Sequence, residues 1–550
     1  MNAVEPAIWT TRTTEAIKTG TWRAMLPLHI RAPSPCHQAC PVGGEIAQWI
    51  TQARVGNTHG AWLTLALHNP FPAIAGRVCH HPCETACNRS GHDEALAICK
   101  LERFVGDTAL ERGWALPRAE AERTQSVAVV GGGPSGLSAA YQLRRLGYRV
   151  TLVEAKPLLG GLMRYGIPGY RLGRDVLDGE IARIVDMGLD LRCGQPLSGP
   201  QDLARLRDEH DAVYMATGAA ISKRLAPLDY DRPWVMDGAE YLARVAADDM
   251  PPLGRRLLVV GGGSAAFDVA RSARRAGHDV SLLTLEAEDR LPAQAAEVAE
   301  AIEEGIRLID SSMLKGATPQ PDGTVRVDGI GVRFLAGAQR GMFTLDPVAG
   351  SDFTLSVDAI VSAIGQDPDL SSLKPSLACS GALLAVDRNG ATSASDIWAG
   401  GDLASMARYV TEAVGMGERA ALAIHRSLTG QVLDTDAATP QRAVGLESIS
   451  RYHHPHQPRA TETTLELSLR LRGQAEVQLG LDIEAALAEA DRCFSCGTCT
   501  NCDNCVTYCP DMAVLRQGDG YVVLSDYCKG CGLCVSECPS GSMVMQEELR

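Results

Sequence analysis

The chain has 550 residues, a formal net charge of −14, and ordinary shares of apolar (45%) and charged (21%) residues. This length predicts about three to five domains, and the negative charge argues against nucleic acid or an anionic membrane as the main partner. No apolar run is long enough to cross a bilayer, and the N-terminus lacks the basic and apolar regions of a secretory signal, so we expect a cytoplasmic protein.

The 18 cysteines are concentrated at the two ends of the chain. Six lie within residues 1–100 and ten within residues 493–538, whereas Cys193 and Cys379 stand alone. A reducing cytoplasm does not favour a disulfide framework, and cysteines at short, repeated spacing are typical of iron–sulfur or metal sites. We expect the two isolated cysteines to be small buried apolar residues. Helix-like stretches such as residues 45–56 predict that the N-terminal cysteines belong to a helical iron–sulfur domain.

Residues 126–160 read as a strand, a glycine-rich turn, a helix and a second strand. The turn carries Gly131, Gly133 and Gly136 in a G-x-G-x-x-G pattern directly after the apolar strand VAVV. These glycines allow the backbone to approach a pyrophosphate at the helix N-terminus. Glu154 ends the second strand, where a carboxylate can accept hydrogen bonds from a ribose. Strand, turn, helix and acid together predict a dinucleotide site.

Residues 255–286 repeat this pattern with an offset of 130 residues. The second turn carries Gly261, Gly263 and Ala266, and alanine at the last position still permits close packing of helix and strand. The repeat predicts two Rossmann-like domains. Two dinucleotide sites in one chain suit a flavin reductase in which one site holds FAD and the other binds NAD(P)H. Residues 353–365 read as strands that return to the first of these domains.

Residues 436–480 lose their apolar periodicity and are interrupted by prolines, which is typical of a linker. We expect the histidines of this segment, His453, His454 and His456, to be solvated and not to bind metal.

The last residues contain two runs of C-x2-C-x2-C-x3-C-P, the pattern of bacterial ferredoxins, in which the fourth cysteine of each run binds the other cluster. One [4Fe-4S] cluster is expected on Cys499, Cys502, Cys505 and Cys538, and the other on Cys528, Cys531, Cys534 and Cys509. Zinc also binds C-x-x-C pairs, but two matched runs that each end in proline favour iron–sulfur clusters.

Several further motifs are similar to those of one enzyme family. They are CHQACPVGGEI, AGRVCHHPCETAC, LERFVGD, GGLMRYGIPGYRL, LPAQAAEVAEAIEEGI and DIWAGGDLA, and they span about residues 36–430. In these motifs the chain resembles the small (beta) subunit of glutamate synthase, the large subunit of the electron-bifurcating NADH-dependent ferredoxin:NADP oxidoreductase, and the N-terminal half of dihydropyrimidine dehydrogenase. The resemblance implies an α/β fold with two Rossmann-like domains and an N-terminal helical iron–sulfur domain, to which this chain adds an α+β ferredoxin domain.

The resemblance also implies how FAD is bound. FAD would be held by Gly131, Gly133, Gly136, Glu154, Gly161 and Arg164, with Asp402 at the ribityl chain. The pattern of the second turn itself predicts that NAD(H) is held by Gly261, Gly263 and Ala266, with Glu286 after the second strand. Relatives that use NADP carry an arginine pair after the second strand, where this chain has Leu285 and Glu286. A carboxylate repels a 2′-phosphate and can accept the free 2′-hydroxyl, so NADH is favoured over NADPH.

The family holds two clusters in the N-terminal domain, partly on a C-x-x-C pair that precedes the first cysteines. This chain has no cysteine before Cys36, but residues 486–496 (ALAEADRCFSC) match that missing segment. One cluster is therefore expected on Cys36, Cys87, Cys493 and Cys496, and the second on Cys40, Cys79 and Cys83. The family position favours Glu102 as the remaining ligand, and thiolate softness favours Cys99, one helical turn away; we prefer Glu102. The alternative is a single N-terminal cluster, with Cys493 and Cys496 taking no part and three clusters in the chain instead of four.

The expected domains follow from these assignments. They are a helical iron–sulfur domain (1–120), an FAD-binding domain in two parts (121–225 and 351–435), an NAD(H)-binding domain (226–350), a linker (436–485) and a two-[4Fe-4S] ferredoxin domain (486–550).

Together these features predict an FAD-dependent NADH:acceptor oxidoreductase that passes electrons singly along [4Fe-4S] clusters. We expect an electron-transfer subunit whose partner is ferredoxin or another oxidoreductase subunit, for example a thiamine-dependent 2-oxoacid:acceptor oxidoreductase or dissimilatory sulfite reductase. One alternative is a glutamate synthase small subunit, which the ferredoxin tail and the missing arginine pair disfavour. Another is a non-catalytic electron wire, which the two intact nucleotide loops disfavour.

Overall fold

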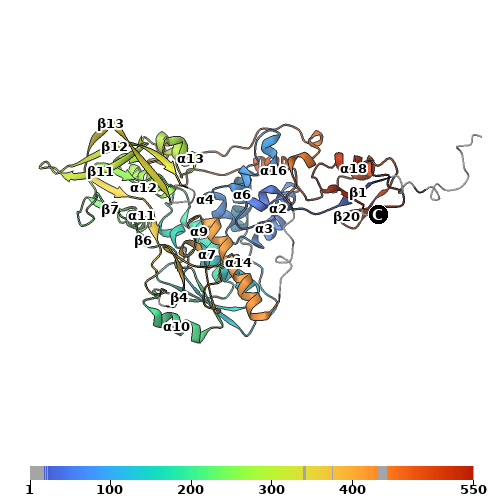
Figure 1. Ribbon diagram of the computed structural model, residues 1–550, viewed down its shortest axis with the longest axis horizontal. Helices are drawn as coiled ribbons and strands as arrows, with labels where there is room; N and C mark the ends of the chain where they lie inside the picture. Colours follow the sequence, from blue (N-terminus) through green and yellow to red (C-terminus); the bar gives the residue numbers. More distant parts are fainter. Residues whose placement is uncertain are drawn as a thin grey trace, which may run out of the picture.

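The computed structural model describes residues 18, 20, 23–337, 342–374, 376–431 and 442–548. Its N-terminal helices lie at the centre of the molecule (Figure 1). One nucleotide-binding domain lies below these helices and the other to their left, and the C-terminal module forms the right-hand end. The central position of the N-terminal helices places them between the nucleotide-binding domains and the C-terminal module.

The N-terminal domain is a group of short helices that carry the first six cysteines. Its helices are α1 (Pro35–Ala39), α2 (Ile46–Arg54), α3 (Thr58–Ala66), α4 (Pro72–Val78), α5 (Pro82–Thr85) and α6 (Ile98–Glu111). Helices α4 and α6 touch through two glycines: a Cβ at Gly106 would lie 2.2 Å from the nitrogen of Ala73, and one at Gly76 would lie 2.4 Å from the Cα of Arg103. This close approach brings the cysteine after α4 near the middle of α6.

The first nucleotide-binding domain is built on a parallel sheet of order β18-β5-β2-β3-β4. Its strands are β2 (Ser126–Val130), β3 (Arg149–Glu154), β4 (Asp190–Cys193), β5 (Ala212–Met215) and β18 (Ile397–Ala399). Helices α7 (Pro134–Arg145), α9 (Arg174–Val185), α10 (Pro200–Glu209) and α14 (Val410–Thr429) surround it. Strand β4 lies at the edge of the sheet, so Cys193 is exposed, contrary to the expectation of burial, and Cys379 is only half-buried. No described helix is both long and apolar enough to cross a membrane.

The second nucleotide-binding domain has a parallel sheet of order β10-β9-β8-β14-β7. Its strands are β7 (Val235–Asp237), β8 (Arg256–Val260), β9 (Asp279–Leu283), β10 (Arg307–Ile309) and β14 (Ala359–Ser362), and its helices are α11 (Gly238–Ala246), α12 (Ser264–Arg275) and α13 (Ala295–Glu303). An antiparallel sheet of β11 (Ser312–Pro319), β12 (Val325–Ala336) and β13 (Phe343–Val357) accompanies it.

Strand β14 differs from the sequence-based expectation for residues 353–365. It pairs in parallel with β8 and β7 and so belongs to the second sheet, not the first. The four residues of β14 are buried and apolar or small, which identifies a central strand but not the sheet that contains it. The chain returns to the first domain after β14, where β15 (Gln366–Asp367) pairs with β6 (Ile221–Ser222) and the two crossing segments run side by side.

The C-terminal module contains α17 (Asn504–Thr507), β19 (Val514–Gln517), β20 (Gly520–Val523), α18 (Leu533–Ser536) and β21 (Met543–Glu547). Helix α16 (Ile483–Asp491), which precedes the module, lies against α2 and α6 of the N-terminal domain (Figure 1). Strand β21 pairs antiparallel with β1 (Met25–His29), which comes from the opposite end of the sequence. The module is therefore completed by the segment that precedes the first cysteine.

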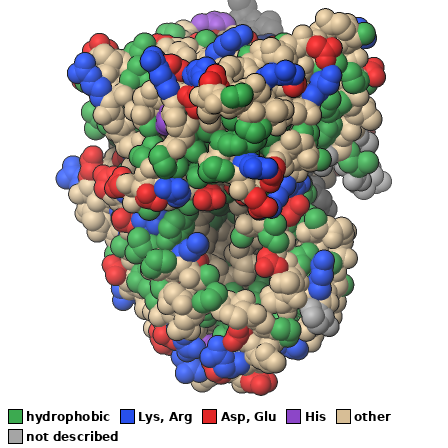
Figure 2. Space-filling model, turned by 90° about the vertical axis from the view of Figure 1, so that its left-hand side faces the viewer, with side chains coloured by type: hydrophobic (Ala, Val, Ile, Leu, Met, Phe, Trp, Pro, Cys, Tyr) green, Lys and Arg blue, Asp and Glu red, His purple; other side chains and the backbone are tan. Residues whose placement is uncertain are grey.

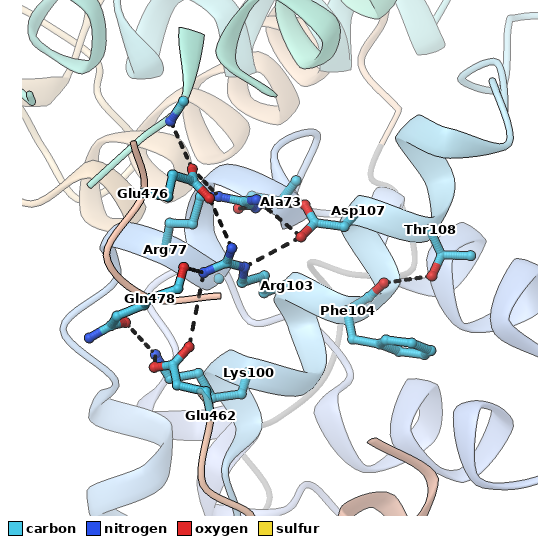
Figure 3. A network of polar contacts seen from close by, with 12 residues as sticks. Ala73, Arg77, Lys100, Arg103, Phe104, Asp107, Thr108, Glu462, Glu476 and Gln478 are labelled. Carbon is cyan, nitrogen blue, oxygen red and sulfur yellow. Dashed lines mark hydrogen bonds and ion pairs between the residues drawn. The ribbon is translucent and has the colours of Figure 1, made fainter. Parts of the chain in front are cut away.

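Residues 442–482, which we call the strap, lie in the predicted linker. The strap has little regular structure apart from α15 (Leu467–Arg470), yet buried ion pairs hold it against α4 and α6 (Figure 3). Glu476 accepts a hydrogen bond from Arg77 Nε at 2.7 Å and another from Arg103 Nη2 at 2.9 Å. Buried ion pairs thus fix this part of the strap to the N-terminal domain, while Val444 and Ile449 at its start pack against Phe494 in a small apolar cluster.

The strap also touches both nucleotide-binding domains. The backbone N–H of Gly173, at the start of α9, donates to Glu476 at 2.8 Å, and Arg470 pairs with Glu303 at the end of α13 at 2.7 Å. The sequence predicts a loose linker here because the segment lacks apolar periodicity. In the folded chain these contacts are ion pairs and hydrogen bonds, which need no apolar periodicity. The strap therefore joins three parts of the molecule.

Candidate flavin, nucleotide and iron–sulfur sites

The first glycine-rich turn leaves space that side chains would fill. Gly131 has a φ of +111°, and a Cβ there would lie 2.3 Å from the carbonyl oxygen of Ala216. A Cβ at Gly136 would lie 1.9 Å from the oxygen of Gly131, so α7 packs against the turn only because this position is glycine. Gly133 caps the N-terminus of α7. This cradle at a helix N-terminus fits a dinucleotide pyrophosphate.

The other residues expected at FAD surround the same turn. Glu154, at the end of β3, is buried, and its carboxylate accepts hydrogen bonds from the N–H groups of Gly132 (2.6 Å) and Lys156 (2.7 Å). Gly161 has a φ of +51°, and a Cβ there would come within 2.8 Å of the Cα of Gly133. Arg164 donates to the carbonyl of Leu159 at 2.6 Å and pairs with Asp178, which fixes its guanidinium beside Gly160 and Gly161.

Asp402 reaches this site from a later part of the chain. It lies in a short 3-10 helix directly after β18, and Gly400 donates to the carbonyl of Met215 at the end of β5 at 3.0 Å. A Cβ at Gly401 would lie 3.0 Å from that of Ser135 in α7. The residues expected to bind FAD therefore gather at the carboxyl ends of adjacent parallel strands, where nucleotides bind in folds of this kind.

The second glycine turn has the same geometry. Gly261 has a φ of +144°, a Cβ there would lie 2.4 Å from the oxygen of Ala363, and Ala266 is fully buried behind it. The carboxylate of Glu286 overlies this turn, because a Cβ at Gly262 would lie 2.7 Å from Glu286 Oε2. Burial raises the pKa of the Glu286 carboxyl. Viewed from the side of the second domain, the molecule is hollowed between its upper and lower parts (Figure 2).

Four of the expected cluster ligands line one cavity, which we call the Cys36 site. They are Cys36 of α1, Cys87 after α5, and Cys493 and Cys496 after α16. Apolar side chains such as Ile50 and Phe494 complete the wall. Burial raises the pKa of Cys493 to about 11 and that of Cys496 to about 12. Four thiols around one apolar cavity are a donor set that fits a [4Fe-4S] cluster.

A second group, the Cys40 site, is formed by Cys40, Cys79, Cys83 and Glu102. The three cysteines end or begin short helices, and Glu102 lies in the middle of α6. Burial raises the pKa of all three thiols, that of Cys79 to about 12, and the charge of Glu102 raises them further. Burial also raises the pKa of the Glu102 carboxyl to about 7.

Cys99, the other candidate for the fourth ligand, is oriented differently. Its sulfur lies 3.3 Å from the carbonyl oxygen of Gly76 and 3.5 Å from that of Ala75, and it is almost fully buried. A thiol donates to a carbonyl only while it is protonated, whereas a cluster ligand is a thiolate. This geometry favours Glu102 over Cys99.

The cysteines of the C-terminal module form two further groups. Cys499, Cys502, Cys505 and Cys538 line one cavity. The other group is Cys509, Cys528, Cys531 and Cys534; burial raises the pKa of Cys534 to about 11, and the charges of the other three raise it further. Both groups are those expected from the ferredoxin pattern.

Two of the three strap histidines, His453 and His454, are half-buried and not the solvated residues that the sequence predicts, whereas His456 is exposed. His454 donates to the carbonyl of Pro539 at 2.9 Å, and its ring lies 4.4 Å from that of Phe494. His456 stacks on His92 at 3.9 Å. His454 thus lies between the Cys36 site and the C-terminal module, because Phe494 follows Cys493 and Pro539 follows Cys538.

Comparison with known proteins agrees with this geometry. The pyridine nucleotide-disulphide oxidoreductase model matches residues 102–167 and 125–417. The model of dihydropyrimidine dehydrogenase domain II with its 4Fe-4S cluster matches residues 30–114, and a 4Fe-4S binding domain matches residues 521–543. The chain belongs to the FAD/iron–sulfur NAD(P)H oxidoreductases that include the glutamate synthase small chain.

Three relatives illustrate the range of this oxidoreductase family. The beta subunit of the NADP(+)-dependent formate dehydrogenase of Moorella thermoacetica is 34% identical over 84% of this chain and 70% of its own length. A homolog of the NAD-dependent dihydropyrimidine dehydrogenase subunit PreT from Salmonella typhi is 33% identical over 72% of this chain and 91% of its own. The glutamate synthase [NADPH] small chain of Azospirillum brasilense is 32% identical over 71% and 85%.

As a member of this oxidoreductase family, the chain is an NAD(P)H-dependent iron–sulfur flavoprotein with two Rossmann-like sheets, an N-terminal helical iron–sulfur domain and a C-terminal ferredoxin module. Sequence reasoning did not single out Asn69 and Thr411, which contact Glu102 and Cys79. Their motifs, HNPFP and RYVTEA, carry no pattern typical of iron–sulfur chemistry, so only the fold brings them to the Cys40 site.

Proposed function

We propose that this chain oxidises NADH in its second nucleotide-binding domain and delivers the electrons through FAD and four [4Fe-4S] clusters to a partner protein. When bound, FAD accepts a hydride and gives up its two electrons singly, which is what one-electron clusters require. The glycine turns, Glu154 and Asp402 would hold it beside the N-terminal helices.

One observation carries the proposal: short segments of the chain link consecutive cysteine sites. Each such segment supplies one ligand to one site and one to the next. The linking pairs are Cys36 and Cys40, Cys83 and Cys87, Cys496 and Cys499, Cys505 and Cys509, and Cys534 and Cys538. Four extended residues span at most about 14 Å, so each pair keeps its two sites close together. The order of the sites is then Cys40, Cys36, the cavity of Cys499, and the group of Cys528.

The first site in this order is the one beside the flavin domain. Cys79 of the Cys40 site contacts Thr411 in the first turn of α14, the helix that follows the Asp402 turn. The last site lies in the C-terminal module at the far end of the molecule (Figure 1). This order supports an electron path that enters at FAD and leaves through the ferredoxin module.

The position of Glu286 supports NADH as the electron donor. Its carboxylate overlies the second glycine turn, and no arginine replaces it or its neighbour Leu285. A carboxylate at this place accepts the hydroxyls of an unphosphorylated ribose and repels the 2′-phosphate of NADPH.

The relatives support a redox subunit as the partner. The three named above are a subunit of a formate dehydrogenase, a homolog of a dihydropyrimidine dehydrogenase subunit and the small chain of a glutamate synthase. We infer that the acceptor of this chain is a second oxidoreductase subunit or a ferredoxin, and that its own active site performs no chemistry beyond hydride and electron transfer.

The proposal is tested by cofactor content and anaerobic reduction of the full chain. We expect one FAD and about sixteen iron atoms per chain, the sum of four cubane clusters. NADH should bleach both the flavin bands and the broad iron–sulfur shoulder, and the proteins that co-purify with the chain should include a redox subunit. A chain with four or fewer iron atoms, or one whose flavin NADH does not reduce, would overturn the proposal.

A further inference from the structure

Helix α14 connects the FAD site with the Cys40 site. On one side a Cβ at Gly417 would lie 2.3 Å from the carbonyl oxygen of Ser135, in the first turn of α7. On the other side a Cβ at Gly415 would lie 2.2 Å from the carbonyl oxygen of Pro41, the residue after Cys40. Both approaches are too close for a residue with a Cβ, so the backbone of α14 contacts both the FAD site and the Cys40 site.

The N-terminus of α14 also contacts the segment that carries Cys79, another cysteine of the Cys40 site. Thr411 lies in the first turn of α14, and its hydroxyl oxygen is 3.6 Å from the sulfur of Cys79. Both side chains are buried, at 6% and 8% exposure. Tyr409, two residues before Thr411, packs against His80 with the rings tilted and their centroids 4.1 Å apart. The contact between Thr411 and Cys79 is therefore held in place by packing of both segments of the chain.

The direction of this hydrogen bond follows from the chemistry of the ligand. A cysteine that binds iron is a thiolate and has no proton to give, so the threonine hydroxyl is the donor. The backbone N–H of His81 also points at this sulfur, at 3.4 Å. Hydrogen bonds to ligand sulfurs are among the features that set the reduction potential of a cluster, because they stabilise the more negative reduced form.

We propose that Thr411 is a positioning residue that donates to the ligand sulfur of Cys79 and raises the reduction potential of the cluster nearest the flavin. This inference rests on the proposed function, in which Cys79 is a ligand. By raising that potential, Thr411 makes the first one-electron step away from the flavin more favourable. The helix that holds the flavin site thus also tunes its first acceptor.

The test compares full-length variants by redox titration of the clusters, followed by EPR. Thr411→Val removes the hydroxyl and keeps the branched shape of the side chain. Thr411→Ala removes both the hydroxyl and the branch, whereas Thr411→Ser keeps the hydroxyl. Thr108→Val is the matched control, because the Thr108 hydroxyl donates to the carbonyl of Phe104 in its own helix (Figure 3). The N–H of His81 is unchanged in every variant, so the comparison isolates the hydroxyl.

We expect Thr411→Val and Thr411→Ala to keep the wild-type iron and FAD content while one cluster moves to a more negative potential. Thr411→Ser and Thr108→Val should titrate as the wild type does. The inference is overturned if neither hydroxyl-free variant shifts a potential, or if Thr411→Ser shifts as far as Thr411→Val. If the wild-type chain binds its full FAD but holds no cluster on Cys40, Cys79 and Cys83, the proposed cofactor arrangement itself is wrong. The iron content of the wild type identifies that case before any variant is compared.

Discussion

The side-chain amide of Asn69 donates a hydrogen bond to the carboxylate of Glu102 at 2.8 Å. The orientation of this amide is fixed, because its oxygen accepts the N–H of Phe71 at 3.0 Å. Asn69 is buried and Glu102 is half-buried, and one carboxylate oxygen of Glu102 is occupied by a neutral donor. Asn69 stabilises an ionised carboxylate next to three buried thiols, which is the arrangement that a mixed cysteine and carboxylate ligand set requires.

We predict that Glu102 is needed for the cluster of the Cys40 site and that Cys99 is not. Glu102→Ala should lower the iron content by about four atoms per chain, since a cubane with three cysteines and no fourth ligand is lost or degraded. Cys99→Ala should keep the wild-type iron content, because its thiol donates to backbone carbonyls of α4. Iron and flavin analysis of the purified variants measures both, and iron loss in Cys99→Ala alone would reverse the assignment.

A second prediction concerns the cysteine pair after α16. The double variant Cys493→Ser, Cys496→Ser should lose about four iron atoms per chain and keep both clusters of the ferredoxin module, because these two sulfurs line the cavity of the Cys36 site. Cys193→Ser, which changes an exposed cysteine, is the control and should keep all of its iron. If the double variant also keeps its full iron content, the pair is idle and the N-terminal domain holds a single cluster.

The sequence predicts those parts of the fold that depend on local pattern. The glycines of two similar strand-turn-helix units and the spacing of the cysteines are enough to predict both nucleotide-binding domains and the ferredoxin module. The sequence does not predict contacts between segments that are far apart along the chain. The pairing of β1 with β21 joins the two ends of the chain, and no local pattern in residues 25–29 indicates it.

The strap and the Cys40 site illustrate the same limit. The strap has the composition of a linker because its partners are charged side chains on α4 and α6, and a polar segment in isolation gives no sign of its partners. Asn69 and Thr411 come from a turn and from the start of a helix that lie far apart in sequence, and they meet the cluster ligands only in the folded chain.

Glu286 leads to a prediction about the choice of nucleotide. Wild-type kcat/KM should be higher with NADH than with NADPH in dye reduction, and Glu286→Arg should move the ratio toward NADPH by about tenfold or more, equivalent to about 1.4 kcal/mol. The reason is that a carboxylate beside the glycine turn is replaced by a group that pairs with the 2′-phosphate. Glu288→Arg is the control, because Glu288 is exposed two residues further on and should leave the ratio unchanged. A wild-type preference for NADPH would show that Glu286 does not select the nucleotide.

The last prediction concerns the stability that Glu476 gives to the assembled molecule. Its carboxylate accepts from Arg77, Arg103 and the N–H of Gly173, and the two guanidinium groups are almost fully buried (Figure 3). Glu476→Gln removes the negative charge and leaves Asp107 as the nearest carboxylate to both arginines. Removing one partner of a buried ion pair costs about 3 kcal/mol, because the remaining charges stay desolvated.

We therefore expect Glu476→Gln to unfold at a lower temperature than the wild type and to bind the strap less firmly, so that proteolysis within residues 442–482 becomes faster. Asp279→Asn is the control, because the Arg255 pair it breaks is solvent-exposed and exposed pairs contribute little. Differential scanning calorimetry and limited proteolysis measure the two effects. If Glu476→Gln and Asp279→Asn lower the unfolding temperature equally, the strap is not held by its ion pairs. The contacts around Val477 must then hold it, since this residue is buried and its backbone N–H donates to the carbonyl of Tyr170 at 2.9 Å.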